Sequence, residues 1–598
     1  MSFHLILRRA VVLTLAALLS ISTGVMASLA QQGASSPLQA ATRPSPYKRL
    51  EGPTHPRPPR TYDALHYTIR TRFDVPQRTV FGDETLTLKP LAAGFKSFDL
   101  DAASMKIDSV TLASDGQKLV WTQTPDKLSI NLDRAYAPAE TINVRIQYRA
   151  NPQRGLYFIT RTQAVDGVRK PAQIWTQGEP EENHHWFPCY DFPDDKATSE
   201  QYITTGAGEV AISNGALLDA TDNPDGTRTF HWQMAQPHAT YLISMVVGSY
   251  AKLTDAYKNI PVEYYTYPGT EQTARRAFAR TPEMMQWFSS ALRYEYPYNK
   301  YAQTVVSYFI FGGMENITAT THADWEILRS DAATHSATQD LIAHELAHSW
   351  FGNLVTCKDW SHAWLNEGLA TFMEASFREH AQGRAGYLEA MRENASLYYA
   401  EDKLRYRRPL VYERYRTPID LFDATLYKKG ALVMHMLREV VGDQMFWKAL
   451  NRYLNENRFE TVETADLERA FEETTGKKLD WFFEQWVYKA GYPEVRVRYV
   501  YNAATRQLTL YVAQTQTPDT TTPAVFRLPV DVELTTAAGT RTEHLEIRRR
   551  EEQFTFKLES KPVSVSFDKN SRLLMKLDFP QSQEMRPALA ASLALQPR

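Results

Sequence analysis

Hydrophobic and polar positions alternate with a period of two along much of the first 250 residues. The segments that show this pattern are 65–71, 85–88, 107–112, 142–148 and 241–247, with turn residues between them. Successive side chains of a strand point to opposite faces of a sheet, so the alternation predicts short strands. We therefore expect an all-β domain over residues 59–252.

A helical period replaces the alternation after about residue 255. Apolar residues then recur three and four positions apart in the segments 274–292, 432–441 and 446–454. This pattern predicts a mostly helical domain over 253–490. Alternation returns after Gly491, in the segments 495–499, 508–512 and 530–534. It predicts a β-sandwich-like domain over 491–580, and the fold class is therefore multidomain α+β.

The two ends of the chain differ in composition from these domains. Arg8 and Arg9 precede an apolar run from Ala10 to Ile21, which small-residue sites follow. This order is typical of a cleavable secretory signal, here over 1–30, and predicts a periplasmic or secreted protein. An uncleaved anchor is the alternative, although the run is short for a bilayer. We expect residues 31–58 to be a flexible leader and 581–598 a tail.

Charge and cysteine content narrow the classes of partner and of site. A net charge of -2, from 67 basic and 69 acidic side chains, favours neither nucleic acid nor an anionic membrane surface as a partner. No segment after the signal approaches a membrane span. The only cysteines, Cys189 and Cys357, exclude a disulfide framework and a cysteine zinc site. We expect two buried free thiols, with one bridge as the alternative.

The segment His344-Glu345-Leu346-Ala347-His348 predicts a metal site. Residues four apart in a helix differ by about 40° in direction and about 6 Å in height, so both imidazoles leave one face. Two nitrogen ligands on one face suit a zinc ion. The helix is expected to start with a capping box formed by Ser336 and Gln339. The alternative is a surface helix with two unrelated histidines.

Glu367 supplies a third ligand of the expected kind. Eighteen residues separate it from His348, and it lies in a second apolar helical segment. Two antiparallel helices would bring its carboxylate to the two imidazoles and leave one metal position for water. Glu345 points off the histidine face towards that position, where it can act as general base. We expect one Zn²⁺ per chain.

Four further motifs make the chain resemble the gluzincin zinc aminopeptidases, the family of aminopeptidase N and leukotriene hydrolase. In chain order they are Gln177-Gly178-Glu179-Pro180 with Phe187-Pro188-Cys189-Tyr190-Asp191, then Gly312-Gly313-Met314-Glu315-Asn316, Tyr427-Lys428-Lys429-Gly430-Ala431, and the closing segment Trp486 to Pro493. The resemblance covers about residues 62–493. It implies an N-terminal β domain, a thermolysin-like catalytic domain and a C-terminal β-sandwich, without the large helical C-terminal domain of many members.

The resemblance also implies roles for residues outside the zinc motif. Glu179 and Glu315 would bind the free α-ammonium of a peptide, and Tyr427 would donate a hydrogen bond to the oxyanion. Gly312 and Gly313 would let a substrate backbone pass close to a strand edge. The remaining motif residues implied to bind substrate are Gln177, Met314 and Asn316. The family's Ala-Arg before F-P-C is replaced by His184-His185-Trp186, which affects the shape of the pocket.

The predicted function is zinc-dependent removal of N-terminal residues from peptides that carry a free N-terminus. Metal-activated water attacks the first peptide bond, Glu345 is the general base and Tyr427 stabilises the oxyanion. A catalytically silent peptide-binding relative of the same fold is the alternative from another class. Endopeptidase action and hydrolysis of epoxides by the same site are two further alternatives. The sequence predicts neither the preferred first residue nor the oligomeric state.

Overall fold

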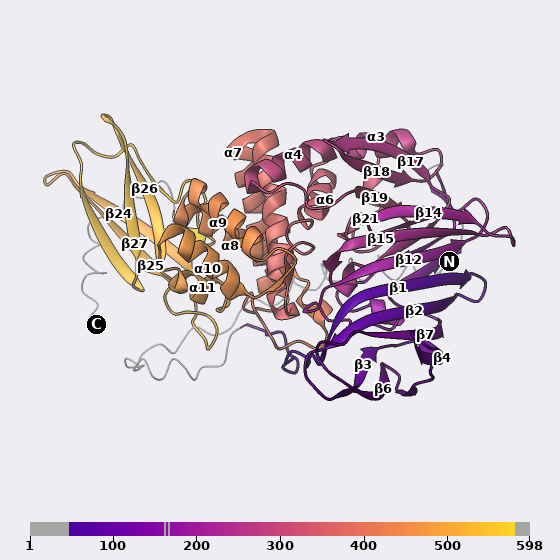
Figure 1. The fold of residues 1–598 in the computed structure, drawn as a ribbon. Helices are drawn as coiled ribbons and strands as arrows, with labels where there is room; N and C mark the ends of the chain where they lie inside the picture. Colours follow the sequence, from indigo (N-terminus) through magenta and orange to yellow (C-terminus); the bar gives the residue numbers. More distant parts are fainter. Residues whose placement is uncertain (1–46, 161–162, 166–167, 580–598) are drawn as a thin grey trace, which may run out of the picture. The chain divides into compact units, whose positions relative to one another are not determined.

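The computed structural model describes residues 47–160, 163–165 and 168–579 (Figure 1). The predicted signal, most of the leader and the tail from residue 581 lie outside these residues. In chain order the described residues form an N-terminal β domain, a largely helical domain and a C-terminal β domain, which confirms the predicted fold class. Among the helices of the described residues, none is long and apolar enough to cross a membrane.

Strands build the N-terminal domain. They are β1 (Tyr62–Asp74), β2 (Thr79–Pro90), β3 (Phe95–Asp101), β4 (Met105–Leu112), β5 (Val120–Gln123), β6 (Lys127–Tyr136), β7 (Ile142–Ala150), β8 (Leu156–Ile159), β9 (Gln163–Val165), β10 (Val168–Lys170), β11 (Gln173–Thr176), β12 (Ala197–Thr205), β13 (Val210–Ser213), β14 (Ala216–Asp222), β15 (Arg228–His238) and β16 (Met245–Gly248), with the short helices η1 (Asn183–His185) and η2 (Thr240–Leu242). The main sheet has the order β14-β15-β12-β1-β2-β7-β4, and smaller sheets are β13-β16-β11-β8, β3-β6-β5 and β10-β9. The strict alternation of buried and exposed residues in β7 shows why the period-two pattern was informative here.

The segment 241–247 differs from its prediction. Its first residues belong to η2, and only Met245–Gly248 forms a strand. Every residue from Thr240 to Val247 is buried. A fully buried segment shows an apolar run whatever its backbone conformation, so periodicity could not separate the two elements.

The middle region, expected to be the catalytic domain, begins with strands and continues with helices. Its elements are β17 (Ala251–Tyr257), β18 (Ile260–Thr266), α3 (Glu271–Phe278), α4 (Thr281–Leu292), β19 (Tyr301–Val306), β20 (Gly313–Met314), β21 (Ala319–Ala323), α5 (Asp324–Ile327), α6 (Ser336–Ala347), β22 (Thr356–Cys357), η3 (Trp360–His362), α7 (Trp364–Leu404), η4 (Pro418–Leu421), η5 (Thr425–Lys429), α8 (Gly430–Val441), α9 (Asp443–Glu456), β23 (Thr461–Val462), α10 (Thr464–Thr475) and α11 (Asp480–Trp486). A five-stranded sheet has the order β17-β18-β19-β21-β20. The short strand β20 is therefore at its edge.

Two features of this region were not predicted. The expected helix over 274–292 is two helices, because Pro282 stands in the first turn of α4 and cannot continue a helix through its missing N–H. The five-stranded sheet was missed because β19 is buried at all six positions and so has no alternation. The first error overlooked a local helix-breaking residue, and only the second comes from burial.

The C-terminal domain has two facing sheets. Its strands are β24 (Glu494–Asn502), β25 (Gln507–Gln514), β26 (Leu528–Thr536), β27 (Gly539–Ile547), β28 (Glu551–Lys557), β29 (Ser564–Phe567) and β30 (Lys576–Asp578). The sheets have the orders β28-β25-β24-β30 and β27-β26-β29. Val497 and Leu510 from one sheet share a buried core with Val532 from the other. No helical domain follows the sandwich within the described residues.

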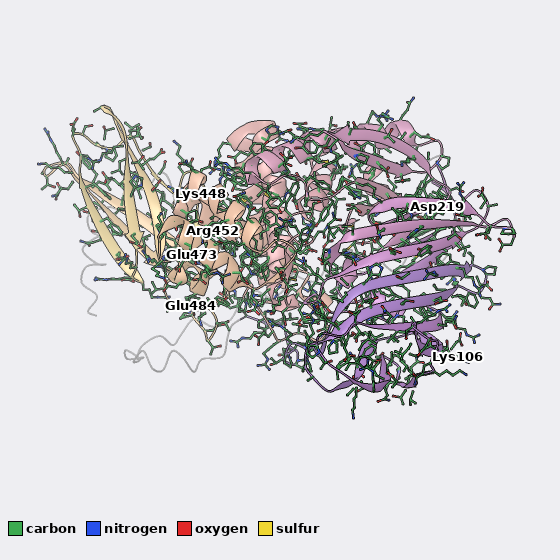
Figure 2. All side chains as sticks on the ribbon, viewed as in Figure 1. Lys106, Asp219, Lys448, Arg452, Glu473 and Glu484 are labelled. Atoms are coloured by element: carbon green, nitrogen blue, oxygen red, sulfur yellow. The ribbon has the colours of Figure 1, made fainter. Side chains whose placement is uncertain are left out.

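Two hydrophobic cores stabilise the described chain. One lies within the N-terminal domain, and the other runs through the catalytic helices into the C-terminal sandwich. Residues 47–58 lie along the catalytic domain, where Tyr412 donates a hydrogen bond to the carbonyl of Leu50 (2.8 Å) and His55 stacks on Tyr415. Some charged residues pair on the surface instead, as Arg452 of α9 does with Glu473 of α10 (Figure 2).

Candidate active site

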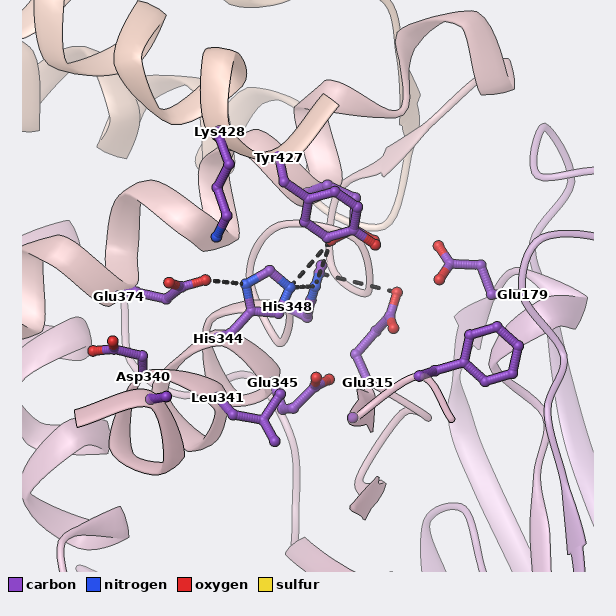
Figure 3. Close-up of a pocket in the computed structure, with 14 residues that line it drawn as sticks. Glu179, Glu315, Asp340, Leu341, His344, Glu345, His348, Glu374, Tyr427 and Lys428 are labelled. Carbon is purple, nitrogen blue, oxygen red and sulfur yellow. Dashed lines mark hydrogen bonds and ion pairs between the residues drawn. The ribbon is translucent and has the colours of Figure 1, made fainter. Parts of the chain in front are cut away.

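The three predicted metal ligands converge from two helices. His344 comes from the last turn of α6, His348 is the C-cap residue of that helix, and Glu367 comes from the first turn of α7 (Figure 3). The two Nε2 atoms are 3.0 Å apart, and Glu367 Oε2 is 3.1 Å from Nε2 of His344 and 3.4 Å from Nε2 of His348. Three ligand atoms of the types that zinc prefers therefore meet at one point.

The opposite ring nitrogens set the tautomer of both histidines. His344 Nδ1 lies 2.6 Å from Oε1 of Glu374, and His348 Nδ1 lies 2.8 Å from the carbonyl oxygen of Phe351. Both partners only accept, so each Nδ1 carries the hydrogen and donates it. In the neutral rings both Nε2 lone pairs then face the same point, which is the arrangement of histidine metal ligands. The donor set fits a zinc ion.

The start of α6 differs from the prediction. His335 is the N-cap of α6, its side chain makes no cap hydrogen bond, and Ser336 is the first helical residue. Gln339 does not turn back to form a capping box. Its amide donates to the carbonyls of Ala277 and Ala332 instead. The predicted capping box is wrong because a buried Gln is used to bond neighbouring carbonyls, which sequence spacing does not reveal.

Buried carboxylates dominate the electrostatics around the imidazoles. Burial lowers the pKa of His348, but the charges of Glu315 and Glu367 outweigh it and raise the pKa to about 9. Burial raises the pKa of Glu345 to about 8, against the lowering effect of both imidazoles. Burial and the charge of Glu315 raise the pKa of Glu179 well above its usual value. A divalent cation would relieve this accumulation of negative charge.

Glu179 and Glu315 lie beside the metal ligands on one side of the cavity (Figure 3). Both are buried, and within the described residues Oε1 of each has no hydrogen-bond partner. A buried carboxylate oxygen without a donor is costly, and two such oxygens facing one cavity form a receptor for a cationic group. Glu179 follows β11 in the N-terminal domain, so the receptor is completed by two domains.

Glu345 and Tyr427 face the same cavity, which has a volume of about 320 Å³. Oε2 of Glu345 is buried and has no hydrogen-bond partner in the described part of the chain. The ring of Tyr427, on η5, stacks 5.9 Å from the ring of His344. Burial and the nearby carboxylates, Glu367 foremost, raise the pKa of Tyr427 well above its usual value, so its phenol stays protonated and can donate.

Gly313 lines the cavity, whereas four other predicted substrate-binding residues are not among its described lining residues. These four are Gln177, Gly312, Met314 and Asn316. Gln177 donates to the sulfur of Met314 (3.1 Å), and Asn316 donates to Thr321 (3.0 Å). These bonds join the segments that directly follow β11 and β20, which carry Glu179 and Glu315, to β20 and β21.

Three charged residues that line the cavity were not predicted from the sequence: Asp340, Glu374 and Lys428. Glu374 is seven residues after Glu367 on α7, two helical turns along the same face, and that spacing was an available signal. Burial acts to raise the pKa of Glu374, but the ammonium of Lys428 and the hydrogen bond from His344 lower it below its usual value. Lys428 and Asp340 carried no such local signal.

Models of known protein families match most of this architecture. A peptidase family M1 domain matches residues 276–486, and a peptidase M1 N-terminal domain matches residues 63–242. A domain of unknown function with an Ig-like fold matches residues 491–572. Together the first two matches cover more than half of the chain.

Curated relatives are similar over part of their length. Aminopeptidase N of Streptomyces lividans is 30% identical over 55% of this chain and 39% of its own length. Aminopeptidase M1 of Arabidopsis thaliana is 30% identical over 57% of this chain and 39% of its own length. The chain thus spans about two fifths of these relatives.

A solved structure has the same fold. Aminopeptidase A of Legionella pneumophila, in complex with aspartic acid, superposes with a TM-score of 0.75 at 21% identity, over 88% of this chain and 60% of that one. At this identity the similarity concerns the fold.

Proposed function

Because the chain belongs to peptidase family M1, we propose that it is a zinc-dependent aminopeptidase that removes residues one at a time from the amino end of peptides. The observation that carries the proposal is the pair of unpartnered carboxylate oxygens on Glu179 and Glu315, next to the converging ligands. An α-ammonium satisfies both by charge-assisted hydrogen bonds, whereas an internal amide cannot.

His344, His348 and Glu367 would hold the zinc ion, which supplies Lewis acidity to the scissile carbonyl and to the attacking water. Glu179 and Glu315 hold the ammonium and so place the first peptide bond at the ligands. Glu345 takes a proton from the water on its carboxylate and delivers it to the leaving nitrogen. The Tyr427 phenol donates a hydrogen bond to the carbonyl oxygen as it becomes negative.

The exopeptidase assignment is tested by comparing an aminoacyl amide that has a free amino group with its N-acetylated form. We expect hydrolysis of the free amine and a loss of at least about a hundredfold on acetylation, because the two carboxylates then lack a cationic partner. Equal rates for both forms would indicate an endopeptidase, and no hydrolysis of either would support the silent peptide-binding relative.

The general base is tested with Glu345→Gln, which keeps the shape and removes the basic oxygen. We expect turnover to fall by about 10²–10⁴-fold or more while zinc remains stoichiometric by elemental analysis. Glu473→Gln, an exposed change on α10, is the control. Glu367→Ala should lose metal and activity together. Full turnover in Glu345→Gln would contradict the assigned role.

Export is proposed from the first thirty residues alone. Basic residues, a short apolar run and small-residue sites support a cleavable signal. We expect the mature protein to begin after Ala27 or Ala30, which the intact mass of the protein purified from its own compartment would measure. A mass that includes residue 1 would contradict cleavage.

A further inference from the structure

The cavity continues past the metal ligands on the side opposite the ammonium receptor. Figure 3 shows Glu179 and Glu315 on one side of His344 and His348, and Lys428 with Glu374 and Asp340 on the other. A peptide that binds with its amino group at the receptor must run across the two imidazoles. The residue that follows the scissile bond therefore enters the part of the cavity near Lys428.

The two carboxylates near Lys428 already have partners of their own. Asp340 accepts hydrogen bonds of 2.9 and 3.1 Å from the guanidinium of Arg378. Glu374 accepts the Nδ1 hydrogen of His344 at 2.6 Å. Neither acid needs Lys428 to complete its hydrogen bonding. Within the described residues the Lys428 ammonium itself makes no hydrogen bond and has no carboxylate within 4 Å.

The next residue, Lys429, has a structural role in this turn and differs from Lys428. Lys429 is fully buried, and its ammonium donates to the carbonyl of Lys489 (3.1 Å). Lys428 instead is half-buried and lines the cavity. It directly follows Tyr427 in η5, a π-helical turn, and turns of this kind are frequent at functional sites. The turn thus presents a phenol and an ammonium side by side to a bound peptide.

We propose that Lys428 binds a carboxylate carried by the residue that follows the scissile bond. This inference rests on the proposed aminopeptidase function. The carboxylate is either the chain end of a dipeptide or the side chain of an acidic second residue, since both place a negative charge one residue past the cleaved bond. A partly desolvated ammonium favours such a group over the neutral amide. Dipeptides and peptides with an acidic second residue are therefore the favoured substrates.

The test compares matched substrates that share the same first residue. One pair is a dipeptide and its C-terminal amide, which reports the chain-end carboxylate. The other pair is two amidated dipeptides with Asp or Asn in second place, which reports the side chain. We expect at least one pair to favour the acid by about tenfold in kcat/KM, chiefly through KM. The ratio should fall to near one in Lys428→Met and return in Lys428→Arg.

Two controls distinguish the binding of a substrate carboxylate by Lys428 from a general effect of removing a lysine and from a loss of zinc. Lys448→Met removes an exposed lysine of α9 and should keep the wild-type ratio. Zinc content is measured for every variant. Ratios near one for both pairs in the wild type would overturn the inference, and so would an equal loss on acid and amide in Lys428→Met. Equal loss with lower zinc content would identify Lys428 as a support for Glu374. Failure to cleave any free-amine substrate would contradict the proposed function itself.

Discussion

Gly313 makes room for the carboxylate of Glu345. A Cβ built on Gly313 would lie 1.9 Å from Oε1 and 2.4 Å from Cδ of Glu345, far inside van der Waals contact. The glycine was expected to leave space for a substrate backbone, and the structure adds a neighbour within the protein as a second reason. The edge strand β20 and the proposed base are therefore in direct contact.

Gly313→Ala should displace the base without unfolding the protein. Because the added methyl overlaps the carboxylate, we expect turnover to fall by about a hundredfold or more, as on loss of general-base catalysis. Zinc content and the urea midpoint should change little. Gly206→Ala, where the nearest atom is the flexible end of Glu209 at 3.2 Å, is the matched control. Wild-type turnover in Gly313→Ala would contradict this role.

At the scale of elements, two glycines bring α7 and α8 into contact beside the site. A Cβ on Gly368 would lie 2.8 Å from Cα of Gly430, and a Cβ on Gly430 would lie 2.7 Å from Cα of Gly368. Gly368 directly follows Glu367, and Gly430 lies three residues after Tyr427. The contact thus sets the position of Tyr427 relative to Glu367.

Gly430→Ala should therefore force the two helices apart. Backbone atoms cannot yield as side chains do, so we expect a loss of about 1–3 kcal/mol in the free energy of unfolding, measured in urea. Turnover should also fall, because Tyr427 moves relative to Glu367. Gly206→Ala is again the control, since its nearest neighbour is the flexible carboxylate end of Glu209 at 3.2 Å. Equal stability of the two variants would argue against a tight helix contact.

A buried ion pair holds the turn before η5. Arg408 donates to Oδ2 of Asp423 at 2.8 Å and to Oδ1 at 2.6 Å, and both side chains are fully buried. Asp423 also accepts the backbone N–H of Leu426 at 2.8 Å, and its own carbonyl accepts the N–H of Tyr427. The pair therefore orients the turn that carries the tyrosine.

Arg408→Met should leave the carboxylate of Asp423 buried without its counter-charge. Removing one partner of such a pair costs about 3–5 kcal/mol, and we expect a loss of that size in urea unfolding. Arg416→Met, which removes a solvent-exposed pair with Asp420, should cost far less, because water already screens that pair. A loss in Arg408→Met as small as that in Arg416→Met would contradict a stabilising role for the buried pair.

At the scale of the whole molecule, the two cysteines lie in different cores. Cys189 belongs to the core of the N-terminal domain and Cys357 to the core shared by the catalytic helices and the sandwich. Both are buried free thiols, which confirms the expectation and excludes a bridge in this structure. Burial raises the pKa of each thiol well above its usual value, so neither forms a thiolate readily.

Thiol labelling should report this arrangement directly. Without reductant, we expect the native protein to resist alkylation at neutral pH and the urea-unfolded protein to react at two thiols per chain, counted by mass. A pre-reduced sample is the control for oxidation during handling. An unfolded, unreduced chain with no reactive thiol would reveal a disulfide and contradict the structure.

Much of the fold followed from local patterns, and the exceptions have physical causes. Exposed faces of β7 and of the C-terminal strands preserved the period of two, so these elements were predictable. The all-buried strand β19 was not, because burial removes the polar positions that mark a period. Glu374 was not predicted, because its hydrogen bond with His344 depends on where α7 meets α6.

The sequence by itself determined the kinds of ligand and their order, because i, i+4 spacing in a helix places two imidazoles on one face regardless of the rest of the chain. It also determined the resemblance that places Glu179, Glu315 and Tyr427 near them. Only the tertiary structure decided which carboxylate oxygens stay unpartnered and where Lys428 faces. Those properties depend on contacts between segments that lie far apart in the sequence, and a local pattern cannot predict such contacts.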